Sequence, residues 1–151
     1  MAKQDQSGKQ PRSSDDVAAL AEEALKVFQQ ENPAAYKDLV ETFEGKAADV
    51  ALLGHGKFHI SVQKSEVSIE PNVIRGGAST GRGAITPETL MTILEGKSTP
   101  LQEFFRGNLI ARANSTDLHL AYDKFVEFAE TALRSKELQE ILAKFREQFG
   151  V

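Results

Sequence analysis

The chain has 151 residues, a net charge of −4 and no cysteine. Its length fits a single domain with one buried core. The acidic balance excludes the basic surface that nucleic-acid-binding proteins use, so we expect no nucleic-acid partner. The lack of cysteine excludes disulfides, thiol catalysis and cysteine-ligated metal.

Residues 1–14 are polar and free of aromatic side chains, and we expect them to form a disordered tail. Residues 15–151 predict a single domain that begins with two helices. The second helix starts at Asn32-Pro33, a cap followed by a first-turn proline, and ends at Gly45. The first starts at Asp15 and repeats apolar residues at helical spacing: Val17, Leu20, Ala21, Ala24, Leu25 and Phe28.

Between Ala47 and Glu70 the apolar period falls to two, which predicts half-buried strands. A polar turn at Lys64-Ser65 joins two of them into an antiparallel hairpin, and Gly54-His55-Gly56 turns an earlier strand. The alternation places Phe58, Ile60 and Val62 on one face, and His59, Ser61 and Gln63 on the other.

Residues 76–83 read Gly-Gly-Ala-Ser-Thr-Gly-Arg-Gly and predict a flexible loop. Such a segment invites a phosphate-binding interpretation. However, no lysine follows the glycines as a P-loop requires, and Thr86 stands where a dinucleotide fingerprint needs glycine or alanine. We therefore expect no nucleotide cofactor.

Residues 86–110 predict two short helices and a strand. Thr86 and a serine or threonine at 98–99 are caps, Pro87 and Pro100 are first-turn prolines, and Gly96 and Gly107 end the helices. The second helix carries an apolar face, which we expect other residues to cover: Leu101, Phe104 and Phe105.

Two further helices complete the chain. The first is capped by the run at 115–117, and the second restarts near Ser135. The last helix is amphipathic, with a stripe formed by Leu138, Ile141, Leu142, Phe145 and Phe149. Its position at the chain end leaves two roles open, a lid or a permanently docked core helix.

The order of these elements predicts an α+β fold with a largely antiparallel sheet of about five strands, covered by helices on one face. The three histidines have no partner at metal-ligand or catalytic-dyad spacing, and no nucleophile motif is present. We therefore expect no catalytic residue, no metal and no cofactor, and a protein that is not an enzyme.

The central unit resembles the sterol carrier protein 2 family. The matching positions, within a looser likeness over about 46–133, are Gly96-Lys97, Pro100, Phe104-Phe105, Gly107 and Leu109. The resemblance implies an apolar pocket between sheet and helices that holds a lipid. Arg82 would lie at the pocket mouth and bind an anionic head group. The lining residues would be Phe58, Ile60, Met91, Leu94, Leu101, Phe104, Phe105 and Leu109.

The expected function is non-catalytic binding or transfer of a fatty acid, phospholipid or sterol-like molecule. The alternative is an accessory or scaffold protein that binds enzymes of a lipophilic biosynthetic pathway. We expect transient membrane contact at most. The sequence carries neither a secretion signal nor a long apolar run, so we expect a cytoplasmic protein.

Overall fold

The computed structural model describes residues 12–151. The expected disordered tail falls outside the described residues except at 12–14, where that expectation is wrong. Helix α2 (Arg12–Glu31) already includes these three residues. Ser14 is buried, and its hydroxyl oxygen accepts a hydrogen bond from the Lys57 backbone N–H at 3.2 Å, so contact with a distant strand extends the helix.

The second helix, α3 (Pro33–Thr42), confirms the prediction at its start. The Asn32 side chain accepts a hydrogen bond from the Ala35 N–H at 3.3 Å, and Pro33 occupies the first turn. The Asn32 side chain satisfies one backbone N–H group that the first turn leaves without a partner, and Pro33 has no N–H group to satisfy.

Five strands form one mixed sheet in the order β3-β2-β1-β4-β5. Three neighbouring pairs are antiparallel, and β1 and β4 are parallel. The expected hairpin is confirmed, because Lys64 and Ser65 turn the chain with φ angles of 54° and 63°. The strands are β1 (Ala47–Leu52), β2 (Gly56–Gln63), β3 (Glu66–Pro71), β4 (Gly81–Ile85) and β5 (Leu109–Arg112).

Strand β4 corrects the prediction for residues 76–83. The sequence predicts a loop through Gly83, yet Gly81–Gly83 belong to a strand between β1 and β5. Glycine has a low strand propensity, so the local sequence gives no strand signal here. Backbone pairing with neighbours on both sides supplies what the residues themselves do not favour.

The predicted central unit is confirmed as α4 (Pro87–Leu94) and α5 (Pro100–Phe105). The side chains of Thr86 and Thr99 accept hydrogen bonds from backbone N–H groups of the first turns. Gly96 and Gly107 adopt φ angles of 78° and 81°, which side-chain-bearing residues rarely reach.

The last two helices are α6 (Ser115–Arg134) and α7 (Lys136–Phe149). Asn114 caps α6, one residue before the expected run. Ser135 caps α7 as expected. Leu138, Ile141 and Phe145 of α7 are buried in the core cluster, which favours the docked role over a lid.

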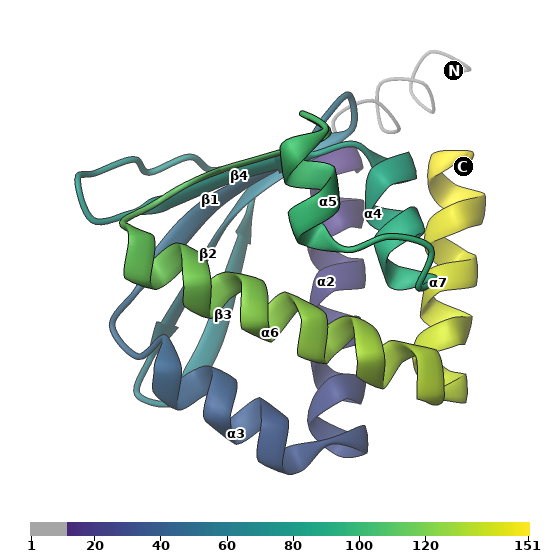
Figure 1. The fold of residues 1–151 in the computed structure, drawn as a ribbon, viewed down its shortest axis with the longest axis horizontal. Helices are drawn as coiled ribbons and strands as arrows, with labels where there is room; N and C mark the ends of the chain where they lie inside the picture. The colour runs from purple at the N-terminus through teal and green to yellow at the C-terminus, as the bar shows by residue number, and fades with distance from the viewer. Residues whose placement is uncertain (1–11) are drawn as a thin grey trace, which may run out of the picture.

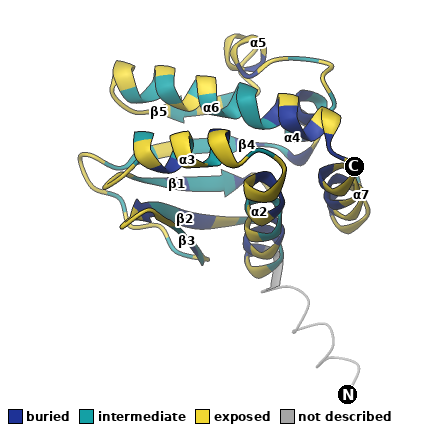
Figure 2. Cartoon of the chain, turned by 90° about the horizontal axis from the view of Figure 1, so that it is seen from below, coloured by how far each residue is buried: buried dark blue, intermediate teal, exposed yellow. Residues whose placement is uncertain are grey.

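Helices α3 and α6 run across the sheet, with α2 beside them and α7 at one side (Figure 1). Seen from below, α3 and α6 lie over the strands (Figure 2). We call the sheet face that carries Phe58, Ile60 and Val62 the inner face. It packs on the helices, while His59 and Ser61 lie on the outer face. The α+β prediction with a mostly antiparallel sheet is confirmed.

Two strand glycines with ordinary backbone angles differ in the space around them. A methyl group on Gly56 would lie 2.7 Å from the Ser14 Cα atom, whereas a methyl group on Gly83 would find only the Ile110 carbonyl oxygen, at 3.9 Å. We predict that Gly56→Ala lowers the free energy of unfolding by about 2 kcal/mol through overpacking. The matched Gly83→Ala should leave it unchanged or raise it by about 0.5 kcal/mol.

Urea denaturation of both variants measures this difference. Equal destabilisation by the two substitutions would contradict the docking of the α2 start against β2.

Candidate functional site

The inner face of the sheet and the helices enclose a continuous cluster of apolar side chains, which we call the apolar layer. Strands contribute Leu52, Phe58, Ile69 and Ile85 as buried members. Helices α2, α4, α6 and α7 supply the opposite side. This layer is where the resemblance to the sterol carrier protein 2 family implies a lipid pocket.

Five of the eight predicted lining residues lie in the apolar layer. Phe58, Met91 and Leu94 are buried, and Ile60 and Leu109 are half-buried and pack against the cluster. They come from β2, α4 and β5, so the fold brings together residues that are far apart in the sequence.

The other three predicted residues point to solvent, contrary to the expectation that other residues would cover this face. Leu101, Phe104 and Phe105 are 47%, 41% and 78% exposed. The residues of α5 that face inward are instead Pro100 and Glu103. Because a helix has one inward side, the buried Glu103 turns the apolar side of α5 outward.

Arg82 also lies away from the apolar layer. It belongs to β4 and pairs with Asp49 on one side and Arg112 on the other, in register with the outer face. Its side chain is exposed. The role of Arg82 at a pocket mouth stays a prediction.

The apolar layer is unevenly filled. The inner face of β1, β4 and β5 carries the small residues Ala48, Gly83 and Ala111. Gly83 pairs with Ala111 of β5 on one side and with Val50 of β1 on the other, and Ala48 lies two residues before Val50. No side chain lies within 4 Å of a methyl group placed on Gly83. Phe125 and Phe128 of α6 are only half-buried although they pack on the cluster. A larger side chain at position 83 would therefore meet no neighbouring side chain within 4 Å of its Cβ atom.

The outer face carries a buried pair of hydrogen-bonded side chains, a carboxylate and an imidazole, that the sequence did not predict. Nδ1 of His59 lies 2.8 Å from Oδ1 of Asp49, and their side chains are 7% and 4% exposed. The backbone N–H groups of Arg75 and Gly76 donate to the same carboxylate at 3.1 and 2.8 Å. The expectation that no histidine has a dyad-type partner is therefore wrong.

The Asp49–His59 pairing comes from strand register. The two residues are directly opposite each other in the β1–β2 hairpin, ten positions apart in sequence. Extending the hairpin outward from its Gly54-His55-Gly56 turn would have placed them together. Burial disfavours the Asp49 charge, but the hydrogen bonds from His59, Arg75 and Gly76 outweigh it and hold the pKa of Asp49 below its ordinary value.

A polar cavity of about 680 Å³ adjoins this pair along β2 and β3. Its lining includes His59, Ser61, Ser68 and an ion pair between Glu70 and Arg75 with N–O distances of 3.0 and 2.7 Å. No described residue hydrogen-bonds Nε2 of His59. The lining consists mainly of hydrogen-bonding groups, with Val67 and Ile69 as its larger apolar members.

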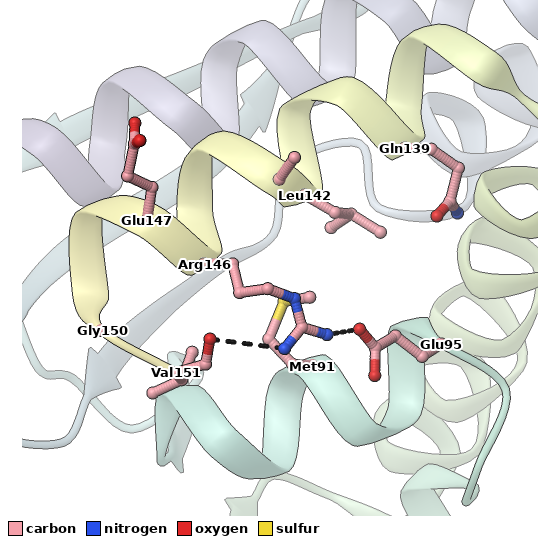
Figure 3. Close-up of a pocket in the computed structure, with 9 residues that line it drawn as sticks. Met91, Glu95, Gln139, Leu142, Arg146, Glu147, Gly150 and Val151 are labelled. Atoms are coloured by element: carbon pink, nitrogen blue, oxygen red, sulfur yellow. Dashed lines mark hydrogen bonds and ion pairs between the residues drawn. The ribbon is translucent and has the colours of Figure 1, made fainter.

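A second depression, of about 520 Å³, lies between α4 and α7. Met91 and Leu142 form its apolar wall, and the Arg146 side chain lies across it (Figure 3). Arg146 forms an ion pair with Glu95 and donates to the Val151 carbonyl oxygen at 3.3 Å. The Arg146 side chain and its partners therefore cross this depression. Of the predicted lining residues, it contains only Met91.

Two solved structures share the arrangement of strands and helices. UbiJ-SCP2, a ubiquinone synthesis protein, is 17% identical, with a TM-score of 0.57 over 80% of this chain and 93% of its own. Sterol carrier protein 2 is 14% identical, with a TM-score of 0.52 over 77% of this chain and 95% of its own. The chain has the sterol carrier protein 2 fold. No protein-family model and no curated protein sequence matches it.

In this chain the apolar layer lies between the sheet and its helices. Identities this low establish the fold and leave ligand and activity to the residues of this chain. Among residues 12–151, no helix is both long and apolar enough to cross a bilayer.

We predict that Asp49→Asn lowers the free energy of unfolding by about 2 kcal/mol at neutral pH, because it weakens charge-assisted hydrogen bonds in a buried site. The pKa of Asp49 is lower in the folded protein than its ordinary value of 3.8. The stabilisation is therefore fully present above that value and is lost as the pH falls through the folded pKa.

Urea denaturation at several pH values measures this effect, and the gap between native protein and variant should close as the pH falls below 3.8. Asp123→Asn is the control, because the Asp123 side chain is 52% exposed and should change stability by less than about 0.5 kcal/mol. A gap that stays constant down to acid pH would contradict the role of the Asp49 charge.

Proposed function

We propose that the protein binds a single hydrophobic ligand, a fatty acid, phospholipid or sterol-like molecule, in the apolar layer and makes or breaks no bond in it. The observation that carries this proposal is the space on the inner side of β4, where a methyl group on Gly83 would meet no side chain within 4 Å, together with half-buried aromatic side chains of α6 that pack on the same apolar layer. A well-packed core leaves few such spaces. A hydrocarbon chain has the shape and polarity to fill one.

In this proposal, Phe58, Ile60, Met91, Leu94 and Leu109 contact the ligand. They offer apolar surface from both the strand side and the helix side of the layer. The three α5 residues stand outside this layer and have a different environment. Arg112 and Arg82 on the outer face remain available to an anionic head group that reaches the edge of the sheet.

The expected affinity follows from the size of the ligand. Each methylene removed from water contributes about 0.8 kcal/mol, so about ten of them supply enough gross free energy for tight binding. Ordering the ligand and the protein offsets part of this gain. A dissociation constant near about 1 μM results, which suits a carrier that must also release its ligand.

A second candidate function is that of an accessory protein for enzymes that make a lipophilic compound. Its support is the shared fold with UbiJ-SCP2, which is named as a ubiquinone synthesis protein. In that case the apolar layer would hold the intermediate or remain filled by side chains. Enzyme capture by the tagged protein without any co-purified lipid would favour this function over carriage.

We predict that Gly83→Val weakens binding of a fluorescent fatty acid at least about tenfold, because its three-carbon side chain occupies space equivalent to about three methylenes of the ligand. Ala84→Val is the matched control, since Ala84 neighbours Gly83 in β4 but faces the outer side. It should bind like the native protein.

Fluorescence titration measures both dissociation constants, and urea denaturation checks that both variants stay folded. Mass spectrometry of an organic extract of the native protein identifies any natural ligand. Native protein that binds no dye and yields no lipid, or two variants that lose binding equally, would contradict the proposed site.

A further inference from the structure

Helix α5 presents an unusual surface for its size. Three of its six residues are large, apolar and exposed, and the rings of Phe104 and Phe105 contact each other at a centroid distance of 5.8 Å. Phe105 is the most exposed of them, at 78%. We call Leu101, Phe104 and Phe105 the α5 patch.

The outward orientation of the α5 patch is held by a polar network beneath it. The buried Glu103 carboxylate accepts hydrogen bonds from the Ser98 hydroxyl at 2.5 Å, from Arg106 at 2.7 Å and from the Asn108 side chain at 2.9 Å. The Asn108 and Ser98 hydrogen bonds, then Arg106, hold the pKa of Glu103 below its ordinary value despite burial. The helix is therefore fixed at both ends and is not a frayed segment with a loosely exposed face.

Most of the exposed charged side chains next to the α5 patch in sequence are basic. Between Gly96 and Asn114 every exposed charged side chain is basic: Lys97, Arg106 and Arg112. The one acidic residue in this range, Glu103, is only 4% exposed and is neutralised by Arg106. The whole chain, in contrast, has a net charge of −4. Lys97 also pairs with Glu95 at 3.2 Å, and Glu95 pairs in turn with Arg146. Four basic side chains, Lys97, Arg106, Arg112 and Arg146, thus share two acidic ones, Glu95 and Glu103, which leaves an excess of positive charge.

We propose that the α5 patch and its basic neighbours form a docking surface for the face of an anionic phospholipid bilayer. Exposed phenylalanine and leucine side chains bury themselves at the boundary of head groups and acyl chains, and nearby lysine and arginine are attracted to anionic lipids. A stable protein interface needs roughly 800 Å² on each partner, more than one six-residue helix supplies. The net negative charge of the rest of the chain limits the contact to a transient one.

This docking surface goes beyond the proposed lipid site and does not require it, because the α5 patch lies outside the apolar layer. The two are nevertheless compatible. A carrier with a surface that touches a bilayer exchanges its ligand without releasing it into water.

Co-sedimentation of the full chain with vesicles tests the proposal. One set of vesicles is pure phosphatidylcholine, and the other is an equal mixture of phosphatidylcholine and phosphatidylglycerol. The native protein should bind the mixed vesicles, and Phe105→Ser should lower the partition coefficient about tenfold. Lys97→Glu and added salt should weaken binding to mixed vesicles and have little effect on neutral ones.

The matched control is Ile74→Ser, which removes an isoleucine that is 49% exposed but lies in the connection between β3 and β4. It should bind vesicles like the native protein. Leu101→Ser provides a second variant on the α5 patch, and thermal unfolding of each variant checks its fold. Fluorescent fatty acid binding, measured on the same samples, should be unchanged by Phe105→Ser.

Native protein that ignores both kinds of vesicle would overturn the docking surface while leaving the lipid site intact. Equal loss of binding in Ile74→Ser and Phe105→Ser would do the same. Capture of another protein that depends on Phe105, without vesicle binding, would reassign the α5 patch to a protein interface.

Discussion

The pairing of Asp49 with His59 holds the strand register on which both faces of the sheet depend. In a β-strand, a slip of one residue exchanges the two faces. Such a slip in β2 would bury His59 among apolar side chains and expose Phe58 and Ile60. The carboxylate also anchors the backbone at Arg75 and Gly76, so it fixes the chain where it leaves the β3 edge and returns to β4 on the far side of β1. One buried charge thus connects three segments of the fold.

The apolar layer beneath that sheet meets different residues at its two ends. At β2 and β3 the helix α2 packs closely, with the start of α2 so near Gly56 that a methyl group does not fit. At β4 and β5 the strands carry glycine and alanine, and no side chain approaches Gly83. Close packing at the β2 end and small residues at the β4 end are the reason why the ligand is proposed to lie next to β4.

The elements that the sequence predicts well depend on local interactions. Thr86 and Pro87 specify a helix start within four residues, and Lys64-Ser65 turns a hairpin between adjacent strands. Five of the predicted lining residues lie in the apolar layer, since alternation and helical spacing fix which side a residue takes once the element is known. Their contact with a ligand stays a prediction.

The remaining features depend on contacts between distant segments. Gly81 to Gly83 become a strand because β1 and β5 pair with them, which glycine residues do not indicate. The face of α5 is decided by Glu103, whose partners Ser98, Arg106 and Asn108 make its burial possible. An apolar spacing of i, i+3 and i+4 is normally read as a core face, so the outward position of Phe105 could not be inferred from the pattern. The outward-facing residues of α5 form the surface that is proposed to contact a bilayer.

The most direct test of the account is methyl NMR spectroscopy of the full chain during titration with a fatty acid. Val50, Ile60 and Leu109 lie on the inner face of the sheet, while Ile110 is exposed on the outer face. A ligand in the apolar layer predicts saturable shifts of the three inner-face methyl signals with Ile110 unchanged. Shifts confined to Ile110 and other exposed methyl groups, or no saturable shift at all, would contradict a lipid site between the sheet and its helices.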